Sequence, residues 1–176
     1  MPFHIDTDIA NEFPIEKQKM SNWCWAACTT AISSFYEGGP PFSQQQLVAK
    51  LLNQPMCKAP NPLLLCNKKF DFGAALETVG HLDGDTIEDP LSASELLAAL
   101  KHGRPVGCQL DIPQMGGHAI VVVAGKTDST RSLFLRVADP SDGSILTLSF
   151  SSLRNNFRST GGRWVRTYFT KPLNEN

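Results

Sequence analysis

The sequence predicts an α+β domain in which helices come first and an antiparallel sheet follows. Up to about residue 104, apolar residues recur at helical spacing between capping residues and glycine or proline stops. Beyond Pro105 the segments are short, rich in β-branched and aromatic residues, and separated by turn-forming clusters. The length of 176 residues, with 41% hydrophobic and 19% charged residues, is typical of one globular domain. We expect a single domain over residues 1–176, with a helical lobe at about 17–104 and a sheet lobe at about 105–170.

Four helices are predicted in the front portion. The first starts within SNWCWAAC, places Trp25, Cys28 and Ile32 on one face, and stops at the GGPP run of residues 38–41. The other three are marked by a capping box of Ser43 with Gln46, by Asp71 as a start, and by a capping box of Ser92 with Glu95. Residues 53–69 hold three prolines and two cysteines, which predicts a loop excursion. Residues 1–16 show no sustained period, and we expect them to form an arm laid over the domain.

Five segments predict the strands of the sheet. They are PVGCQLDI at 105–112, GHAIVVVAG at 117–125, RSLFLRVADP at 131–140, GSILTLSF at 143–150 and RWVRTYFT at 163–170. If the second and third form a hairpin around residues 126–130, Gly125 pairs with Arg131 and His118 lies opposite Ala138. A shift of one residue would instead place Asp139 directly across from His118, and the sequence does not decide between these registers.

Cys24 is the cysteine best placed to act as a nucleophile. If Asn22 is the N-cap of the first helix, the thiol lies in the first turn, where unpaired amides and the helix dipole favour a thiolate. Cys28 lies one turn further along the apolar face, and Cys108 lies in an apolar strand, so packing is the better interpretation for both. On its own, Cys24 would also be interpreted as a core cysteine, and it needs partners.

His118 and Asp139 are the candidate partners. His118 follows Gly116 and Gly117, which permit close backbone approach, at the mouth of an apolar strand. Asp139 precedes Pro140 at the end of the next strand, where a carboxylate can fix the imidazole tautomer; the alternative is an ordinary Asp-Pro turn. A thiol, a base and an acid that orients the base are the groups needed for two-step acyl transfer.

Other residues near the thiol have candidate roles in binding. Gln18, six residues before Cys24, can join the Cys24 backbone N–H in stabilising an oxyanion; the alternative is an exposed loop glutamine. Trp23 and Trp25 can line a cleft between the lobes and contact substrate together with Gly117, or they can pack the lobe interface. No C-x-x-C pair is present, so we expect no metal and no other cofactor.

Four features in the same order resemble one family. Gln18, WCWAA around Cys24, GHAIVVV around His118 and DP at Asp139 are similar to the papain-like cysteine proteases, in particular the compact bacterial branch of avirulence-type effector proteases and related secreted toxins. The resemblance implies that Cys24 attacks a peptide carbonyl, His118 moves the proton, Asp139 orients the imidazole and Gln18 helps to hold the oxyanion. A glutamine deamidase or a transglutaminase-like acyl transferase would use the same three groups and remains an alternative.

The sequence departs from other members of that family. The motif C-G-S-C-W of plant and lysosomal enzymes is absent around Cys24, and Asp139 stands where those enzymes have asparagine. Their peptide preferences are therefore not carried over to this chain.

Composition and charge limit the partners and the location. The net charge of -1 argues against a nucleic-acid binder, and no apolar stretch approaches the length of a membrane span. We expect a protein substrate, no membrane partner and a monomer. The basic segment RNNFRSTGGRWVR is either a solvated hairpin or a site that engages a substrate or an inhibitor protein. The first twenty residues lack a secretory signal, so we expect export by a signal-independent route and action in a target cell.

Five cysteines cannot all pair, so at least one is a thiol. A bridge between Cys57 and Cys66 would staple the proline-rich excursion in an oxidising setting, whereas both would be free in a reducing cytosol.

Overall fold

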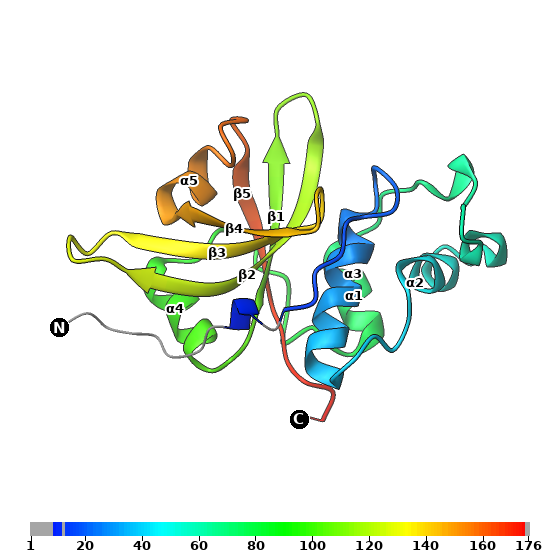
Figure 1. Cartoon of the computed structure of the whole chain (residues 1–176), viewed down its shortest axis with the longest axis horizontal. Coiled ribbons are helices and arrows are strands. Elements are labelled where there is room, and N and C mark those ends of the chain that lie inside the picture. The colour runs from blue at the N-terminus through cyan, green and yellow to red at the C-terminus, as the bar shows by residue number, and fades with distance from the viewer. Residues whose placement is uncertain (1–8, 12, 175–176) are drawn as a thin grey trace.

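A five-stranded antiparallel sheet with helices on both faces makes up the structure, a computed structural model that describes residues 9–11 and 13–174 (Figure 1). The spatial order of the strands is β4-β3-β2-β1-β5. Their bounds are β1 Val106–Ile112, β2 Gly116–Thr127, β3 Leu133–Asp139, β4 Ser144–Ser149 and β5 Arg163–Phe169. The α+β class and the helix-then-sheet order predicted from the sequence are confirmed. Most of residues 1–16, the predicted arm, lies outside the described residues or is irregular chain, with one short 3-10 turn at Ile9–Asn11.

The helices are α1 Cys24–Glu37, α2 Gln44–Leu51, α3 Phe72–Val79, α4 Ala93–Lys101 and α5 Phe150–Asn155. Three of the helices, α2, α3 and α4, begin directly after the capping residues predicted for them, Ser43, Asp71 and Ser92. Both predicted capping boxes are present, and Asp71 caps α3 by accepting the N–H of Ala74. α1 ends at Gly38, whose φ of 73° suits a residue without a side chain. α5 was not predicted, although Ser149 caps it by accepting the N–H of Ser152.

Alternating side chains of β2 serve two separate cores. Ala119, Val121 and Val123 pack with α1 on one face of the sheet, whereas Ile120 and Val122 face the other side. That second core includes Leu96 and Leu100 of α4 and Leu153 of α5. The lobe boundary predicted near residue 104 is therefore wrong for α4, which packs on the sheet and not with α1. Gly125 permits this approach, because a β-carbon there would lie 2.8 Å from Leu97 of α4.

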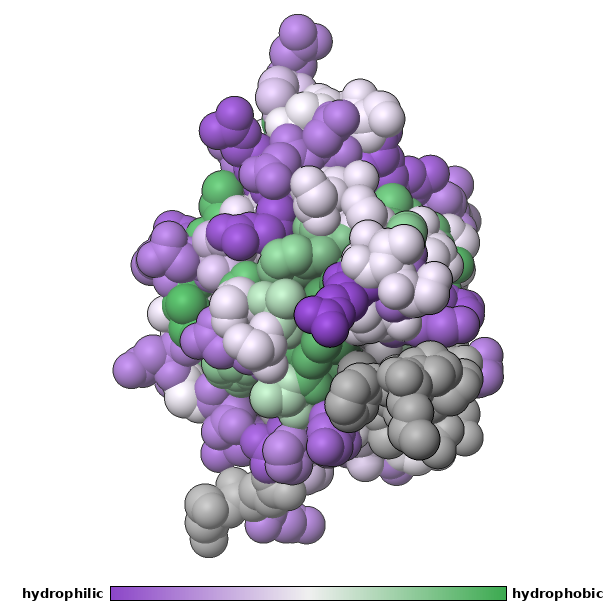
Figure 2. Space-filling model, turned by 90° about the vertical axis from the view of Figure 1, so that its left-hand side faces the viewer, coloured by the Kyte–Doolittle hydropathy of each residue, from purple (hydrophilic) through white to green (hydrophobic). Residues whose placement is uncertain are grey.

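The second core is covered only in part by α4 and α5. Figure 2 views the molecule from the side where these helices lie and shows apolar residues gathered among hydrophilic ones. Half-buried apolar side chains that pack against this core include Ala99, Leu133, Leu148 and Phe150. They remain in contact with buried residues beneath them, so this face is the outer layer of the core.

Neither of the two registers considered for the hairpin of β2 and β3 is present. Gly125 pairs with Leu135, not with Arg131, and the loop lies at residues 128–132. Asp128 explains the longer strands, because its carboxylate accepts the N–H groups of Thr130 and Ser132 and closes the loop there. A register shift between Val122 and Ala124 then leaves Val121 opposite Ala138. His118 and Asp139 are thus diagonal neighbours near the end of the hairpin, within reach of each other's side chains.

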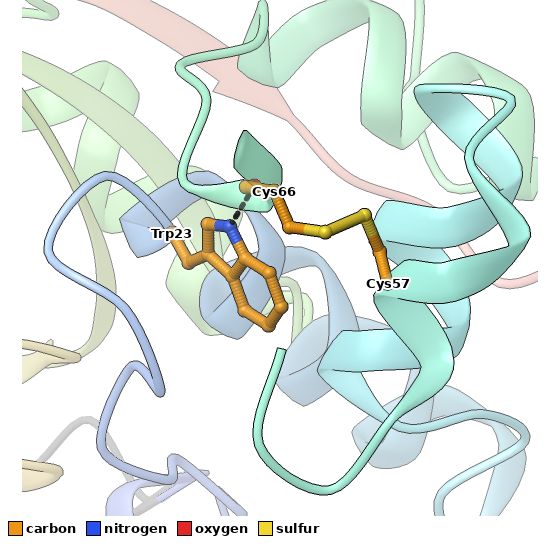
Figure 3. Close-up of a disulfide and its surroundings, with 3 residues drawn as sticks. All are labelled: Trp23, Cys57 and Cys66. Atoms are coloured by element: carbon orange, nitrogen blue, oxygen red, sulfur yellow. Dashed lines mark hydrogen bonds between the residues drawn. A yellow bond between two sulfur atoms is a disulfide. The ribbon is translucent and has the colours of Figure 1, made fainter. Parts of the chain in front are cut away.

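The predicted excursion between α2 and α3 contains two 3-10 turns, Pro55–Lys58 and Leu64–Cys66, and a disulfide that joins Cys57 and Cys66. Both cysteines are fully buried. Trp23 donates its indole N–H to the carbonyl of Cys66 at 2.8 Å, which ties the stapled segment to the residue before α1 (Figure 3). The bridge therefore supports the chain that leads into Cys24.

No helix in the described part of the chain combines the length and the apolar character that a membrane crossing requires.

We predict that the bridge contributes to stability chiefly by limiting the unfolded chain. Closing a loop of this length is worth about 2–3 kcal/mol, which corresponds to a fall of about 5–10 °C in Tm when the bridge is lost. The Cys57→Ser/Cys66→Ser double variant should melt lower than the oxidised protein by this amount in calorimetry. Thiol reductant should lower the Tm of the wild-type protein and leave that of the double variant unchanged. Equal Tm values for the oxidised wild type and the double variant would contradict the prediction.

Candidate active site

A cleft of about 570 Å³ opens where the start of α1 meets the ends of β2 and β3. Residues that line it include Cys24, His118, Asp139, Gln18, Trp25 and Gly117, six of the seven residues singled out for catalysis or binding. They come from three segments far apart in the sequence, the chain before and within α1, the start of β2 and the end of β3.

Cys24 is the first residue of α1 and is half-buried in the cleft. The N-cap is Trp23, not Asn22 as predicted; Asn22 instead binds Asn67 through both its backbone N–H and its side-chain amide. Burial raises the pKa of the Cys24 thiol, but a hydrogen bond to His118 and its positive charge, helped by backbone contacts with Ala119 and Trp25, bring this pKa below the ordinary value. The thiol is therefore poised to ionise.

The other two free thiols have the opposite character. Cys28 and Cys108 are fully buried, and burial raises the pKa of each well above its ordinary value. Cys28 donates its S–H to the carbonyl of Ala119 at 3.4 Å, so it packs α1 against β2. These contacts fit the packing roles predicted for both residues.

His118 contacts Asp139 and Cys24. Its Nε2 atom lies 2.8 Å from Oδ1 of Asp139, and the ring is mostly buried. Burial lowers the pKa of His118, but the hydrogen bonds and charges of Asp139 and Cys24 outweigh it and raise this pKa to about 9. An imidazole that keeps its proton stabilises the thiolate form of the neighbouring Cys24, so the arrangement favours a thiolate–imidazolium ion pair.

Asp139 is a buried carboxylate with every oxygen satisfied. Only 1% of its side chain is exposed, and Oδ1 also accepts the backbone N–H of Ser141 at 2.9 Å. Oδ2 accepts from Nη1 of Arg158 at 2.8 Å. Burial raises the pKa of Asp139, yet the bonds to His118, Ser141 and Arg158 hold it well below its usual range. The group therefore stays ionised and fixes the orientation of the His118 ring.

Arg158 is a site residue that the sequence analysis missed. Its guanidinium reaches both Asp139 and, at 3.3 Å, Asp142, while 41% of its side chain is exposed on the cleft wall. Its φ of 49° is unusual for a residue with a side chain and places it in the tight turn that follows α5. The basic segment was noticed, but nothing in the pattern indicated which arginine would face the acid.

Gln18 is held beside Asp139 by its backbone. Its N–H donates to the carbonyl of Pro140 at 2.7 Å, and Gly143 lies so close to Lys17 that an added β-carbon would come within 2.5 Å of the Lys17 nitrogen. The side-chain Nε2 donates to the carbonyls of Met20 and Ser21, at 3.0 and 2.7 Å, and Oε1 is buried without a partner. The amide therefore lies at the cleft, and a contact with an oxyanion requires one of these N–H bonds to be exchanged.

The two tryptophans differ in position. Trp25 lines the cleft, with its ring 5.1 Å from that of Phe70 and its N–H donated to the carbonyl of Lys68. Trp23 is fully buried and does not line the cleft, so its assignment to substrate binding is wrong; its large apolar ring packs the core instead.

Gly117 leaves room for a second amide in the cleft wall. A β-carbon at this position would lie 2.5 Å from Nε2 of Gln109. Gln109 also lines the cleft, so the missing side chain of Gly117 sets where this amide lies.

Within the described ranges, no group of three or more histidine, cysteine, aspartate or glutamate side chains is arranged to hold a metal ion.

The sequence from residue 4 to residue 158 matches the family model described as papain-like cysteine protease AvrRpt2. The chain belongs to this family. None of the curated proteins matches it. The match spans all four residues on which the resemblance was based, Gln18, Cys24, His118 and Asp139.

Solved structures share the papain-like fold of this family member. The proform of the ragweed pollen allergen Amb a 11, a cysteine protease, has a TM-score of 0.55 and 15% identity; the similarity covers 97% of this chain and 66% of that one. The bromelain protease from Ananas comosus, in complex with the E64 inhibitor, has a TM-score of 0.53 and 14% identity and covers 93% of this chain and 97% of its own. This chain thus spans slightly less than two thirds of the ragweed proform. At these identities the likeness concerns the fold alone.

We predict that the carboxylate of Asp139 controls how readily Cys24 is alkylated. Asp139→Asn removes a charge that raises the pKa of His118, so less imidazolium remains to stabilise the thiolate and the pKa of Cys24 rises. At about pH 6, alkylation of Cys24 by iodoacetamide should slow on the order of tenfold. Peptide mapping should show Cys28 and Cys108 labelled more slowly than Cys24 in the wild-type protein.

Asp142→Asn is the matched control for that experiment. Asp142 also contacts Arg158 but is about half exposed and does not touch His118, so its loss should leave the alkylation rate within about twofold. Equal rates for the wild type and Asp139→Asn, or equal slowing in both variants, would contradict control by Asp139.

Proposed function

We propose that this family member hydrolyses peptide bonds in proteins through Cys24, His118 and Asp139. The observation that carries the proposal is the shared cleft in which a half-buried, acidified thiol faces an imidazole bound to a buried carboxylate. Family membership supports a cysteine peptidase, and the fold supports a cleft between a helix bearing the thiol and a sheet bearing the base. The residue roles are our assignment.

In the proposed reaction, the Cys24 thiolate attacks the carbonyl carbon of the scissile bond and forms a tetrahedral intermediate. The His118 imidazolium then gives its proton to the leaving amine, and the C–N bond breaks to leave a thioester on Cys24. Neutral His118 next takes a proton from a water molecule, which attacks the thioester carbonyl. The C–S bond then breaks, which releases the carboxylic acid and restores the Cys24 thiolate beside the His118 imidazolium. Asp139 keeps the ring oriented throughout.

The negative charge on the tetrahedral oxygen needs donors that are in place before the reaction. Cys24 is the first residue of α1, and amides of a first helical turn have no partner within the helix. We assign its backbone N–H and the Gln18 amide to this role, with Gln18 exchanging its bond to Met20 or Ser21 as substrate binds. The Gln18–Pro140 backbone bond keeps the amide next to the end of β3.

We propose that the protein is an effector or toxin that acts in the cytoplasm of a target cell as a monomer. The family model is that of an avirulence protease, which supports delivery into another cell and protein substrates there. A cognate inhibitor protein would suit the cleft wall at Arg158, whose side chain is 41% exposed.

The test is a search for new N-termini in a target-cell lysate treated with the wild-type protein or with Cys24→Ala. We expect the wild type to produce new termini and Cys24→Ala to produce roughly a thousandfold fewer per unit time, since the nucleophile is gone. The variant should keep the Tm of the wild type within a few degrees, because Cys24 is only half-buried and its replacement by alanine removes little packing.

The intact mass of each modified protein separates the two acyl-transfer reactions. Cleavage yields two fragments, whereas deamidation of a glutamine side chain leaves one chain with a slightly higher mass. Full activity of Cys24→Ala would overturn the nucleophile. Modified substrates without new N-termini would overturn the peptidase and favour the deamidase or transferase.

A further inference from the structure

The excursion between α2 and α3 carries an exposed apolar tip. Leu63, Leu64 and Leu65 are 58%, 80% and 48% exposed, and Met56 is 49% exposed. These are four of the eight large hydrophobic side chains that are exposed among the described residues. We call them the apolar tip. Figure 1 places the excursion, coloured cyan to teal, at the end of the molecule away from α4 and α5.

The chain that bears the apolar tip is fixed to the rest of the protein. The disulfide joins Cys57 and Cys66, both fully buried, on either side of the three leucines (Figure 3). The carbonyl of Cys66 accepts from Trp23, and the next residue, Asn67, binds Asn22. The exposed leucines therefore lie on a segment that these contacts hold in place. The conformational entropy of ordering the loop is lost on folding and not on binding.

The chain on both sides of the apolar tip carries only positive charges. Between Glu37 and Asp71 the chain contains four lysines and no acidic residue. Lys50 lies in the last turn of α2, Lys58 ends the first 3-10 turn, and Lys68 and Lys69 follow the second. All four are exposed. Along the chain, the apolar tip thus has lysines on both sides, although the whole protein is close to neutral. Lys69 lines the catalytic cleft, which leaves Lys50, Lys58 and Lys68 for the tip.

We propose that the apolar tip and its lysines form a docking site for the surface of an anionic lipid bilayer. Aliphatic side chains that protrude can enter the boundary between headgroups and acyl chains, while lysines nearby are attracted to anionic headgroups. Lysine stems can lie along the apolar region with their ammonium groups in the polar layer.

The composition of the site favours lipid over a protein partner. Sites that dominate protein–protein binding are rich in tryptophan, tyrosine and arginine, and protein interfaces are depleted in lysine. The excursion has leucine and lysine and contains none of those three residue types between residues 53 and 69. The expectation of no membrane partner rested on the absence of a membrane span, and a peripheral site needs none.

Sedimentation with lipid vesicles tests the proposal with the oxidised, full-length protein. We expect it to sediment with vesicles of phosphatidylcholine and phosphatidylserine and to bind vesicles of phosphatidylcholine alone at least tenfold more weakly. Leu64→Glu, which places an acid at the most exposed position, should weaken binding to the mixed vesicles by tenfold or more. Added salt should weaken the binding of the wild type.

Leu173→Glu is the matched control, because Leu173 is 49% exposed and lies in the C-terminal segment outside the excursion. It should bind the mixed vesicles as the wild type does. Equal binding by the wild type and Leu64→Glu, or no binding by the wild type, would overturn the lipid assignment; in the second case, protein recognition would be the better account of the tip. Neither result depends on the roles of Cys24 and His118.

Discussion

The buried carboxylate of Asp139 is the group on which the arrangement of the site depends. It lies at the end of β3 and accepts hydrogen bonds from the His118 ring, the Arg158 guanidinium and the backbone N–H of Ser141. The carboxylate itself is buried, and it pairs with two basic side chains. A buried charge is costly unless it is paired and hydrogen-bonded, and here both oxygens are satisfied. This negative charge allows His118 to keep its proton and, through His118, allows Cys24 to lose its own.

The fold brings Cys24 together with His118 and Asp139, which lie about a hundred residues further along the chain. α1 lies against the face of β2 formed by its odd-numbered residues, which brings the first residue of the helix to the start of the strand. The segment directly before α1 runs past the turn after β3, where the Gln18 N–H donates to the carbonyl of Pro140 and Gly143 permits close contact with Lys17. The stapled excursion holds the same entry to α1 from the other side through Trp23. Geometry at the thiol is therefore fixed by contacts between residues distant in sequence.

Local sequence patterns predict the helices and strands, but they do not predict the contacts between segments that are distant in sequence. The capping residues and the alternation of the strands located the elements, and the chemistry of Cys24, His118 and Asp139 predicted a grouping that the cleft contains. Neither of the two hairpin registers considered is present, because the Asp128 loop and the bulge near Val122 act through side-chain bonds that have no periodic pattern. The position of α4, the burial of Trp23 and the pairing of Arg158 also depend on packing partners far along the chain.

The ion pair between Cys24 and His118 is tested most directly by the ultraviolet absorbance of the thiolate during a pH titration. The difference between the wild type and Cys24→Ala isolates this one sulfur from the buried thiols and the tyrosines. The midpoint of the rise in thiolate absorbance should lie below the ordinary thiol pKa of 9.0, because the imidazolium of His118 lowers the pKa of Cys24. A midpoint at or above this value would show that His118 does not stabilise the thiolate of Cys24, and the account of the site would fail.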